Sequence, residues 1–422
     1  DGKHYVVNGQ KMWITNAGFA NLFTVFAKID DDDKLTAFLI EADSEGITLN
    51  SEEKKMGIKG SSTRQVFFND VKVPVENLLS ERENGFKIAL NILNIGRIKL
   101  AAGVMGGAKQ AITESVRYAN DRLQFGREIS KYGAIRYKLA EQTIKTFVNE
   151  SAIYRAGQNI DDAIAGYVAA GMDKGEATLK GIEQFAPECA ILKVSGSEAL
   201  DYVVDEAVQI FGGMGYSAES SVERAYRDAR INRIFEGTNE INRMLSVDLM
   251  LKRAMKGELD LMTPAMKVAD ELMEIPDFDF DDSADYATET RLIGNFKKAV
   301  LLVAGAAAKT LMQQLAKEQE VLMNIADMMM EAYIAESTLL RIQKLGERAT
   351  PEQIAMMNVY LYDAADRIGK AGRDAIQSFA DGDELRAMLM GMKRFTKHEP
   401  FNVKEARRLV AAKLIEENKY CY

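Results

Sequence analysis

The hydrophobic pattern of this chain changes its period once, near residue 84. From residue 1 to about residue 78, apolar and polar residues alternate in short runs separated by Asp, Gly and Ser. That two-residue period is typical of half-buried β-strands. From about Asn84 to the C-terminus, apolar residues recur with the 3.6-residue period of amphipathic helices. The chain is therefore predicted to be mainly α-helical, with an N-terminal β portion.

The β portion shows a turn signal inside its first expected strand. Asn8 and Gly9 lie between apolar flanks, which is the strongest short-range signal for a β-hairpin, so a hairpin is predicted there. Pro74 closes the last expected strand. The expected strands cover residues 5–14, 22–29, 35–42, 46–50 and 64–74.

Long helical patterns follow at residues 85–122, 134–160 and 186–211, and helices of this length favour an antiparallel bundle. Amphipathic helices continue to the C-terminus beyond an acidic stretch at residues 275–285, which is predicted to be a linker. Methionines at helical spacing in that region indicate core packing rather than a binding surface. We expect a partial β-domain at residues 1–78, a helical bundle at residues 79–257 and a helical extension at residues 258–422.

Composition argues against several classes of protein. The chain has 422 residues, a net charge of -9 and no basic block, which argues against nucleic-acid binding. With His4 and His398 as its only histidines, and Cys189 and Cys421 as its only cysteines, the chain offers little for a zinc site or a Ser-His-Asp triad. We therefore expect no metal and no disulfide framework, and a reducing compartment. The longest apolar run, at residues 299–308, is about half the ~20 residues that a membrane span needs.

One carboxylate has an unusual setting, in the stretch RIFEGTNEINR at residues 233–243. Glu236 follows the aromatic Phe235 and precedes Gly237 and Thr238. An isolated Glu-Gly pair after a helix is most often a surface turn. The alternative is a base that meets a substrate, because the apolar neighbour shields the acid and glycine lets a ligand approach the backbone.

Three other stretches carry weaker signals. Trp13, the only tryptophan, either packs in a core or forms a wall for a flat ring, with the Thr15 hydroxyl beside it. Arg122, in RLQFGREI, either caps a helix or pairs with a pyrophosphate, whose oxygens suit its planar fork. The glycine-rich turn QIFGGMGY at residues 209–216 lacks the strand-before, helix-after setting of a dinucleotide fingerprint.

Taken together and in this order, these stretches resemble the acyl-CoA dehydrogenase family. The resemblance runs from the first residue to about Lys256, and the extension beyond it, with Gly133 where many short-chain members carry Gln, resembles the very-long-chain branch. It implies an acyl-CoA dehydrogenase-like fold with a partial middle β-domain, a C-terminal four-helix bundle and an additional helical extension. We therefore interpret the chain as the C-terminal portion of a longer protein. The matching stretches are GQKMWITNAG, RIKLAAGVMGGAKQAITESVRYANDRLQFGREI and AVQIFGGMGYSAESSVERAYRDARINRIFEGTNEINR.

The resemblance implies roles for individual residues. Glu236 is implied to be the catalytic base, because the position on the other helix from which some branches supply a glutamate is Gly96 here. Arg122 and residues 209–213 are implied to hold the ADP part of FAD from a neighbouring subunit. The residues implied to bind FAD are Trp13, Ile14, Thr15, Arg122, Gln124, Phe125, Gln209, Ile210, Phe211, Gly212, Gly213, Thr238, Asn239 and Glu240. The residues implied to line the acyl-CoA site are Asn94, Ile95, Gly96, Arg97, Phe235 and Gly237.

The implied activity is FAD-dependent α,β-dehydrogenation of long-chain fatty acyl-CoA to trans-2-enoyl-CoA in fatty acid β-oxidation. The implied partners are the acyl-CoA substrate, an electron-transfer flavoprotein as electron acceptor, and further copies in a homodimer or tetramer. The amphipathic spacing of the extension, without a spanning segment, predicts that it either widens the subunit contact or associates peripherally with a membrane surface. The expected location is the bacterial cytoplasm, or in a eukaryote the mitochondrial matrix or the inner membrane surface. Two alternatives stay open: an acyl-CoA oxidase with the same fold, and a family-derived assembly or scaffold protein, against which the intact Glu236 weighs.

Overall fold

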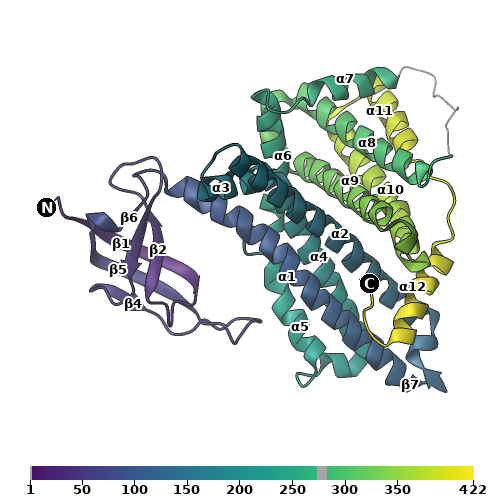
Figure 1. Cartoon of the computed structure of the whole chain (residues 1–422), viewed down its shortest axis with the longest axis horizontal. Coiled ribbons are helices and arrows are strands. Elements are labelled where there is room, and N and C mark those ends of the chain that lie inside the picture. Colours follow the sequence, from purple (N-terminus) through teal and green to yellow (C-terminus); the bar gives the residue numbers. More distant parts are fainter. Residues whose placement is uncertain (1, 273–282) are drawn as a thin grey trace. The chain divides into compact units, whose positions relative to one another are not determined.

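The computed structural model describes residues 2–272 and 283–422 and divides into two compact units, residues 1–95 and 96–422 (Figure 1). Helix α1 (Gly85–Asp121) runs through the boundary between them. The mainly α-helical fold with an N-terminal β portion is confirmed. The linker predicted at residues 275–285 lies mostly outside the described residues.

The first unit contains two antiparallel sheets that share one apolar core. Alternate residues of the strands face this core, among them Phe38, Ile40, Val66, Phe68 and Val71. One sheet has the order β1-β5-β4, from β1 (His4–Thr15), β5 (Thr63–Pro74) and β4 (Ile47–Leu49). The other has the order β2-β3-β6, from β2 (Leu22–Ala27), β3 (Thr36–Glu41) and β6 (Leu78–Leu79), and the 3-10 turn η1 (Val75–Asn77) precedes β6.

The hairpin predicted at Asn8 and Gly9 is wrong. β1 continues through both residues and pairs with the equally long β5, with a shift of register between Val7 and Gly9. The Asn8 amide bonds across this irregularity, donating to Asp70 Oδ1 at 2.9 Å and accepting from the Asp70 backbone N–H at 2.8 Å. An Asn-Gly pair suits a bulge as well as a turn, and the long partner strand decides between them.

The bundle of the second unit contains the predicted helices, although α2 (Gly133–Ala169) continues nine residues beyond the predicted end at residue 160. Small residues bring the helices together: a Cβ built on Gly196 of α4 would lie 3.4 Å from Cα of Ala101 in α1. The helix predicted at residues 186–211 is confirmed, and it ends where Gly212 adopts a φ of 59°. The elements after α1 are β7 (Leu123–Gln124), β8 (Arg127–Glu128), η2 (Ile129–Lys131), α2 (Gly133–Ala169), α3 (Lys174–Gln184), α4 (Ala186–Phe211), η3 (Gly212–Tyr216), α5 (Ser221–Ala229), η4 (Arg230–Arg233) and α6 (Asn239–Met255).

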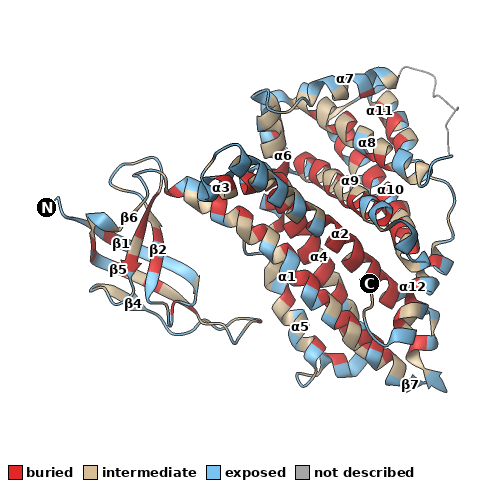
Figure 2. Cartoon of the chain, in the orientation of Figure 1, coloured by how far each residue is buried: buried red, intermediate tan, exposed pale blue. Residues whose placement is uncertain are grey.

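The C-terminal extension is helical and shares one apolar core with the bundle. Its helices α9, α10 and α12 pack against α2, and α9 also packs against α6. Figure 2 shows buried residues running along α2 and α4. Met328, Met356 and Met392 are fully buried, as expected for core residues. The elements are α7 (Met262–Glu271), α8 (Ala287–Leu311), η5 (Met312–Lys317), α9 (Gln319–Leu345), η6 (Gly346–Arg348), α10 (Pro351–Phe379), α11 (Gly382–Phe395) and α12 (Val403–Glu417).

Ion pairs dock the extension on α2. Glu141 and Glu150 of α2 are buried carboxylates, and a buried charge is tolerated only with a partner. Removing Arg407 should cost about 3–5 kcal/mol, because the Glu141 charge would stay buried without this partner. The pairs between α2 and the extension are Glu150 with Arg341 (3.1 Å), Arg155 with Glu336 (2.9 Å) and Glu141 with Arg407 (2.6 Å).

Two helical stretches among the described residues are long and apolar enough to pass a length-and-hydropathy test for a membrane span. α1 and the helical stretch Ala287–Lys317, which contains the apolar run at residues 299–308, both reach the length and hydropathy of a membrane span. Length and composition alone are weak evidence, because helices of a protein core pass the same test. Both contribute buried residues to the core of the helical unit, including Ala108 and Ile112 of α1 and Phe296 and Val303 of α8.

Candidate functional site

Glu236 lies on a short loop between η4 and α6, and its backbone is in the left-handed region. Its φ is 59°, and that of Gly237 is 83°. A non-glycine residue in this region is strained and persists only where its surroundings enforce it. Such strain is concentrated at functional sites, which favours the catalytic interpretation of this acid over a plain surface turn. We call residues 236–238 the Glu236 loop.

The Glu236 carboxylate lies over Gly96 of α1. A Cβ built on Gly96 would stand 2.4 Å from Glu236 Oε2 and 2.7 Å from its Cδ, closer than real Cβ atoms come. The carboxylate therefore occupies the space that any side chain at position 96 would need. The two positions from which the family is expected to supply a base thus converge on one place, and here only position 236 carries the acid.

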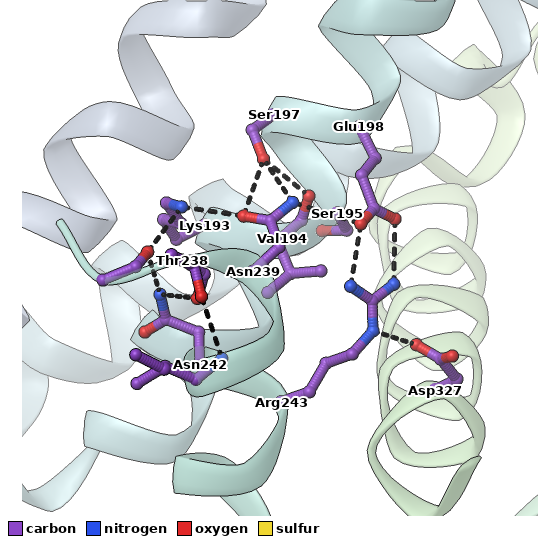
Figure 3. A network of polar contacts seen from close by, with 12 residues as sticks. Lys193, Val194, Ser195, Ser197, Glu198, Thr238, Asn239, Asn242, Arg243 and Asp327 are labelled. Carbon is purple, nitrogen blue, oxygen red and sulfur yellow. Dashed lines mark hydrogen bonds and ion pairs between the residues drawn. The ribbon is translucent and has the colours of Figure 1, made fainter. Parts of the chain in front are cut away.

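Three side chains from three helices hold the carbonyl groups of the Glu236 loop. Arg97 of α1 donates from Nε to Glu236 O at 3.2 Å, and Lys193 of α4 donates from Nζ to Gly237 O at 2.8 Å. Asn242 of α6 donates from Nδ2 to three successive carbonyl oxygens, at 3.3, 2.7 and 3.1 Å for residues 236, 237 and 238. Figure 3 shows its contact with Thr238. Because a trans peptide is planar, turning these carbonyls toward the donors turns the N–H groups of residues 237–239 the opposite way.

Lys193 contacts the Glu236 loop, and the sequence interpretation missed it. Its side chain is fully buried on α4 and also donates to Asn239 Oδ1 at 2.7 Å. Burial, together with the nearby Arg97 guanidinium, lowers the pKa of Lys193 from 10.5 to about 8. The available signal was weak: a lysine within the apolar stretch AILKVSG, where its side chain is either buried or a solvated break in the pattern.

Lys193 should make stability depend on pH in the window from about pH 8 to about pH 10.5. Its folded pKa is depressed from 10.5 to about 8, so the unfolded chain binds more protons there and the free energy of unfolding rises with pH. Lys193→Met removes this slope. Denaturant unfolding measures the free energy of unfolding of both proteins. Between about pH 7 and about pH 9.5, this free energy should rise by about 2 kcal/mol more in the unmodified protein than in the variant. A pH-independent difference between the two proteins would contradict the lowered pKa.

The residues around the Glu236 loop differ in their exposure to solvent and in their hydrogen bonds. Ile234 and Phe235 are exposed, at 47% and 41%, and present an apolar surface beside the acid. Thr238 caps α6, its Oγ1 accepting from Ile241 N–H at 3.3 Å. Asn239 is buried, with its amide bonded to Lys193, Ser197 and Glu198. Glu240 is exposed in the first turn of α6, where backbone N–H groups lower the pKa of its carboxyl.

A second group of predicted residues lines one surface groove of about 800 Å³. Phe125 stands in it 91% exposed with a φ of 51°, and Arg122 is exposed where α1 ends. Two lining residues of the groove pack against each other: Phe211 stacks on Tyr118 with ring centroids 4.0 Å apart. Gly212 and Gly213 have nothing within 4 Å of a built Cβ, so the backbone is open to a ligand. The predicted residues in its lining are Arg122, Gln124, Phe125, Ile210, Phe211, Gly212 and Gly213, and Gln209 is exposed one residue before them.

The remaining predicted residues belong to the unit of residues 1–95. Trp13 is 61% exposed with a φ of 62°, so the core-packing interpretation of this tryptophan is wrong. Ile14 is half-buried and packs on the β core, and Thr15 is exposed at the end of β1. Asn94 is buried and Ile95 half-buried on the turn of α1 that leads to Gly96. Within residues 2–272 and 283–422, no group of three or more His, Cys, Asp or Glu is placed to hold a metal ion.

Comparison with known proteins gives consistent similarities along the whole chain. The model of the acyl-CoA dehydrogenase middle domain matches residues 1–71, and models of the acyl-CoA dehydrogenase C-terminal domain match residues 83–251 and 295–394. A probable acyl-CoA dehydrogenase of Bacillus subtilis is 41% identical over 99% of this chain and 71% of its own length. The very long-chain specific mitochondrial acyl-CoA dehydrogenase of Rattus norvegicus is 45% identical over 58% of this chain, a match that covers 36% of that enzyme. A crystal structure of an acyl-CoA dehydrogenase complexed with FAD from Bacillus anthracis covers all of this chain and 72% of its own, with 43% identity and a TM-score of 0.96.

Proposed function

This chain belongs to the acyl-CoA dehydrogenase family, and on that premise we propose that it catalyses the FAD-dependent α,β-dehydrogenation of long-chain fatty acyl-CoA to trans-2-enoyl-CoA, with Glu236 as the base. The observation that carries the proposal is the strained Glu236 loop, whose carboxylate fills the space over Gly96. The similarity to a very long-chain specific enzyme supports a long acyl chain. This chain spans 71% of the length of the Bacillus subtilis relative. The activity is therefore proposed for the whole protein.

The reaction breaks two C–H bonds and forms one C=C bond. Glu236 takes the proton from Cα of the thioester and holds it on its carboxyl group. FAD, when bound, accepts the hydride that leaves Cβ. Negative charge develops on the thioester oxygen as the α-proton leaves, and a backbone N–H of the Glu236 loop is suited to stabilise it, because the clamped carbonyls fix the direction of these N–H groups. Gly237 leaves room for the thioester to approach the backbone.

The groove at Arg122 fits the ADP part of FAD. Arg122 can pair with two pyrophosphate oxygens at once, and the exposed ring of Phe125 offers a face to a flat base. The open backbone at Gly212 and Gly213 permits close approach of a phosphate. We propose that this cofactor belongs to a neighbouring subunit of a homodimer or tetramer. An electron-transfer flavoprotein is the proposed electron acceptor. The C-terminal extension is proposed to contact a membrane surface.

A flavin spectrum tests the proposed function. The complete protein, purified with FAD, should lose its visible flavin absorbance when palmitoyl-CoA is added without oxygen, and trans-2-enoyl-CoA should form in equal amount. An unchanged spectrum would favour the scaffold alternative. Rapid formation of hydrogen peroxide when air is admitted would favour the oxidase alternative.

A further inference from the structure

A continuous series of polar contacts joins the C-terminal extension to the Glu236 loop, and Arg243 of α6 is its central member. The Arg243 guanidinium uses all three of its nitrogens: Nε donates to Asp327 Oδ1 at 2.7 Å, while Nη1 and Nη2 donate to the two oxygens of Glu198 at 2.8 and 3.0 Å (Figure 3). Asp327 belongs to α9 of the extension and Glu198 to α4 of the bundle. The Arg243 side chain is only 15% exposed, so its charge depends on these partners.

From Glu198 the contacts continue to the loop. Glu198 Oε1 also accepts from Asn239 Nδ2 at 3.1 Å, and Asn239 Oδ1 accepts from Lys193 Nζ at 2.7 Å. Lys193 Nζ then donates to Gly237 O at 2.8 Å, one residue after the proposed base. We call this series the polar relay; its members are Asp327, Arg243, Glu198, Asn239 and Lys193 (Figure 3).

We propose that the extension positions the catalytic carboxylate through the polar relay, with Asp327 as its anchoring residue. This inference rests on the proposed function of Glu236. It assigns the extension a part in the reaction itself, in addition to any role in association. Asp327 is a positioning residue, since it acts on the reacting groups only through other side chains.

The geometry gives a physical reason for such an effect. Each inner member of the relay bonds to a neighbour on both sides, so the orientation of one group sets that of the next. Arg243 and Asn239 both lie on α6, which begins immediately after the loop. When Asp327 is replaced by asparagine, Nε of Arg243 faces a neutral amide oxygen in place of a carboxylate, so the guanidinium is held less strongly in its orientation toward Glu198. The loop is strained, so it relaxes when the contacts that enforce its conformation weaken.

Another ion pair provides a matched control. Glu336 lies on the same helix α9 and pairs with Arg155 of α2 at 2.9 Å, so it also joins the extension to the bundle. Glu336 makes its bonds to Arg155 and Lys297, neither of which is a member of the relay. If the extension acted on the site only by stabilising the bundle, losing either carboxylate would have similar consequences.

The test compares Asp327→Asn with Glu336→Gln in the complete protein loaded with FAD. The rate of flavin reduction at saturating palmitoyl-CoA should fall about 2- to 30-fold in Asp327→Asn, the range that residues in coupled networks show. Glu336→Gln should stay within about twofold of the unmodified protein, and Asp327→Glu should recover part of the lost rate. Equal rates in Asp327→Asn and the unmodified protein, or equal losses in both carboxylate variants, overturn the proposal.

A double-mutant cycle then asks whether the effect passes through the relay. With Lys193→Met in place, adding Asp327→Asn should cost less than about twofold, because the last link to the loop is already broken. Losses that multiply would mean independent effects and contradict the relay. Amide hydrogen exchange gives a readout that needs no turnover: residues 236–242 should exchange faster in Asp327→Asn and not in Glu336→Gln. If the unmodified protein does not reduce its flavin, the proposed function fails, while faster exchange would still show the coupling itself.

Discussion

Replacing Glu236 with glutamine should slow reduction of the bound flavin by acyl-CoA by several orders of magnitude. A general base alone is typically worth about 10²–10⁴-fold, and the chain places glycine at the other position from which a carboxylate could act. Glutamine keeps the size of the side chain and its packing over Gly96. Flavin content and acyl-CoA binding should therefore be preserved, so the loss falls on the reduction step measured by stopped-flow absorbance.

Glu219→Gln serves as the control for this change. Glu219 is an exposed glutamate outside the loop, so it undergoes the same loss of charge without touching the site. Its variant should reduce flavin at the normal rate. A normal rate in Glu236→Gln as well would show that another group removes the α-proton.

Gly96→Ala should slow flavin reduction without lowering the stability of the protein. Alanine favours a helix over glycine by about 1 kcal/mol, and position 96 lies inside α1, so this variant should be no less stable than the unmodified protein. The added methyl group would lie 2.4 Å from Glu236 Oε2 and must push the flexible carboxylate aside. A displacement of about 1 Å at a reacting group can cost about 10²-fold, so flavin reduction should slow by about that factor. The thermal midpoint and the stopped-flow rate are the two measurements.

Gly103 supplies the matched control on the same helix. A Cβ built there has nothing within 4 Å, so Gly103→Ala should give the same helix stabilisation with an unchanged rate. A rate loss shared by both variants would point to a change in α1 as a whole. The exchange Glu236→Gly with Gly96→Glu should recover part of the activity that Glu236→Gln loses, because the two side chains compete for one place.

Periodicity predicted the helices well and the turn at Asn8 poorly, for one physical reason. The predicted helix at residues 186–211 agrees with α4 because its backbone hydrogen bonds are internal and its ends are marked locally, by Pro187 and Gly212. A strand depends on a distant partner. β1 pairs with β5 across the Asn8-Gly9 signal, so a local turn preference was overruled by pairing with residues far along the chain.

The candidate site shows the same division between local and distant information. Glu236 stands out in the sequence because its neighbours Phe235 and Gly237 are chemically unusual around an acid. Lys193 does not, since a lysine within an apolar helix can equally be a solvated break in the pattern. Its partners at residues 237 and 239 lie 44 and 46 positions away, and only the packing of α4 against α6 brings them within hydrogen-bonding distance.

The sequence by itself determined most of the helices and strands, the faces that they bury, and the acid that we propose as the base. Tertiary structure decided which groups meet that acid. Hydrophobic periodicity reports the face that is buried and not the partner that covers it. Arg243 reaches Glu198 and Asp327 across 45 and 84 positions because three helices cross there, and Gly96 matters because α1 passes beneath a loop 140 positions further on. Such contacts depend on how whole helices pack, which no local pattern specifies.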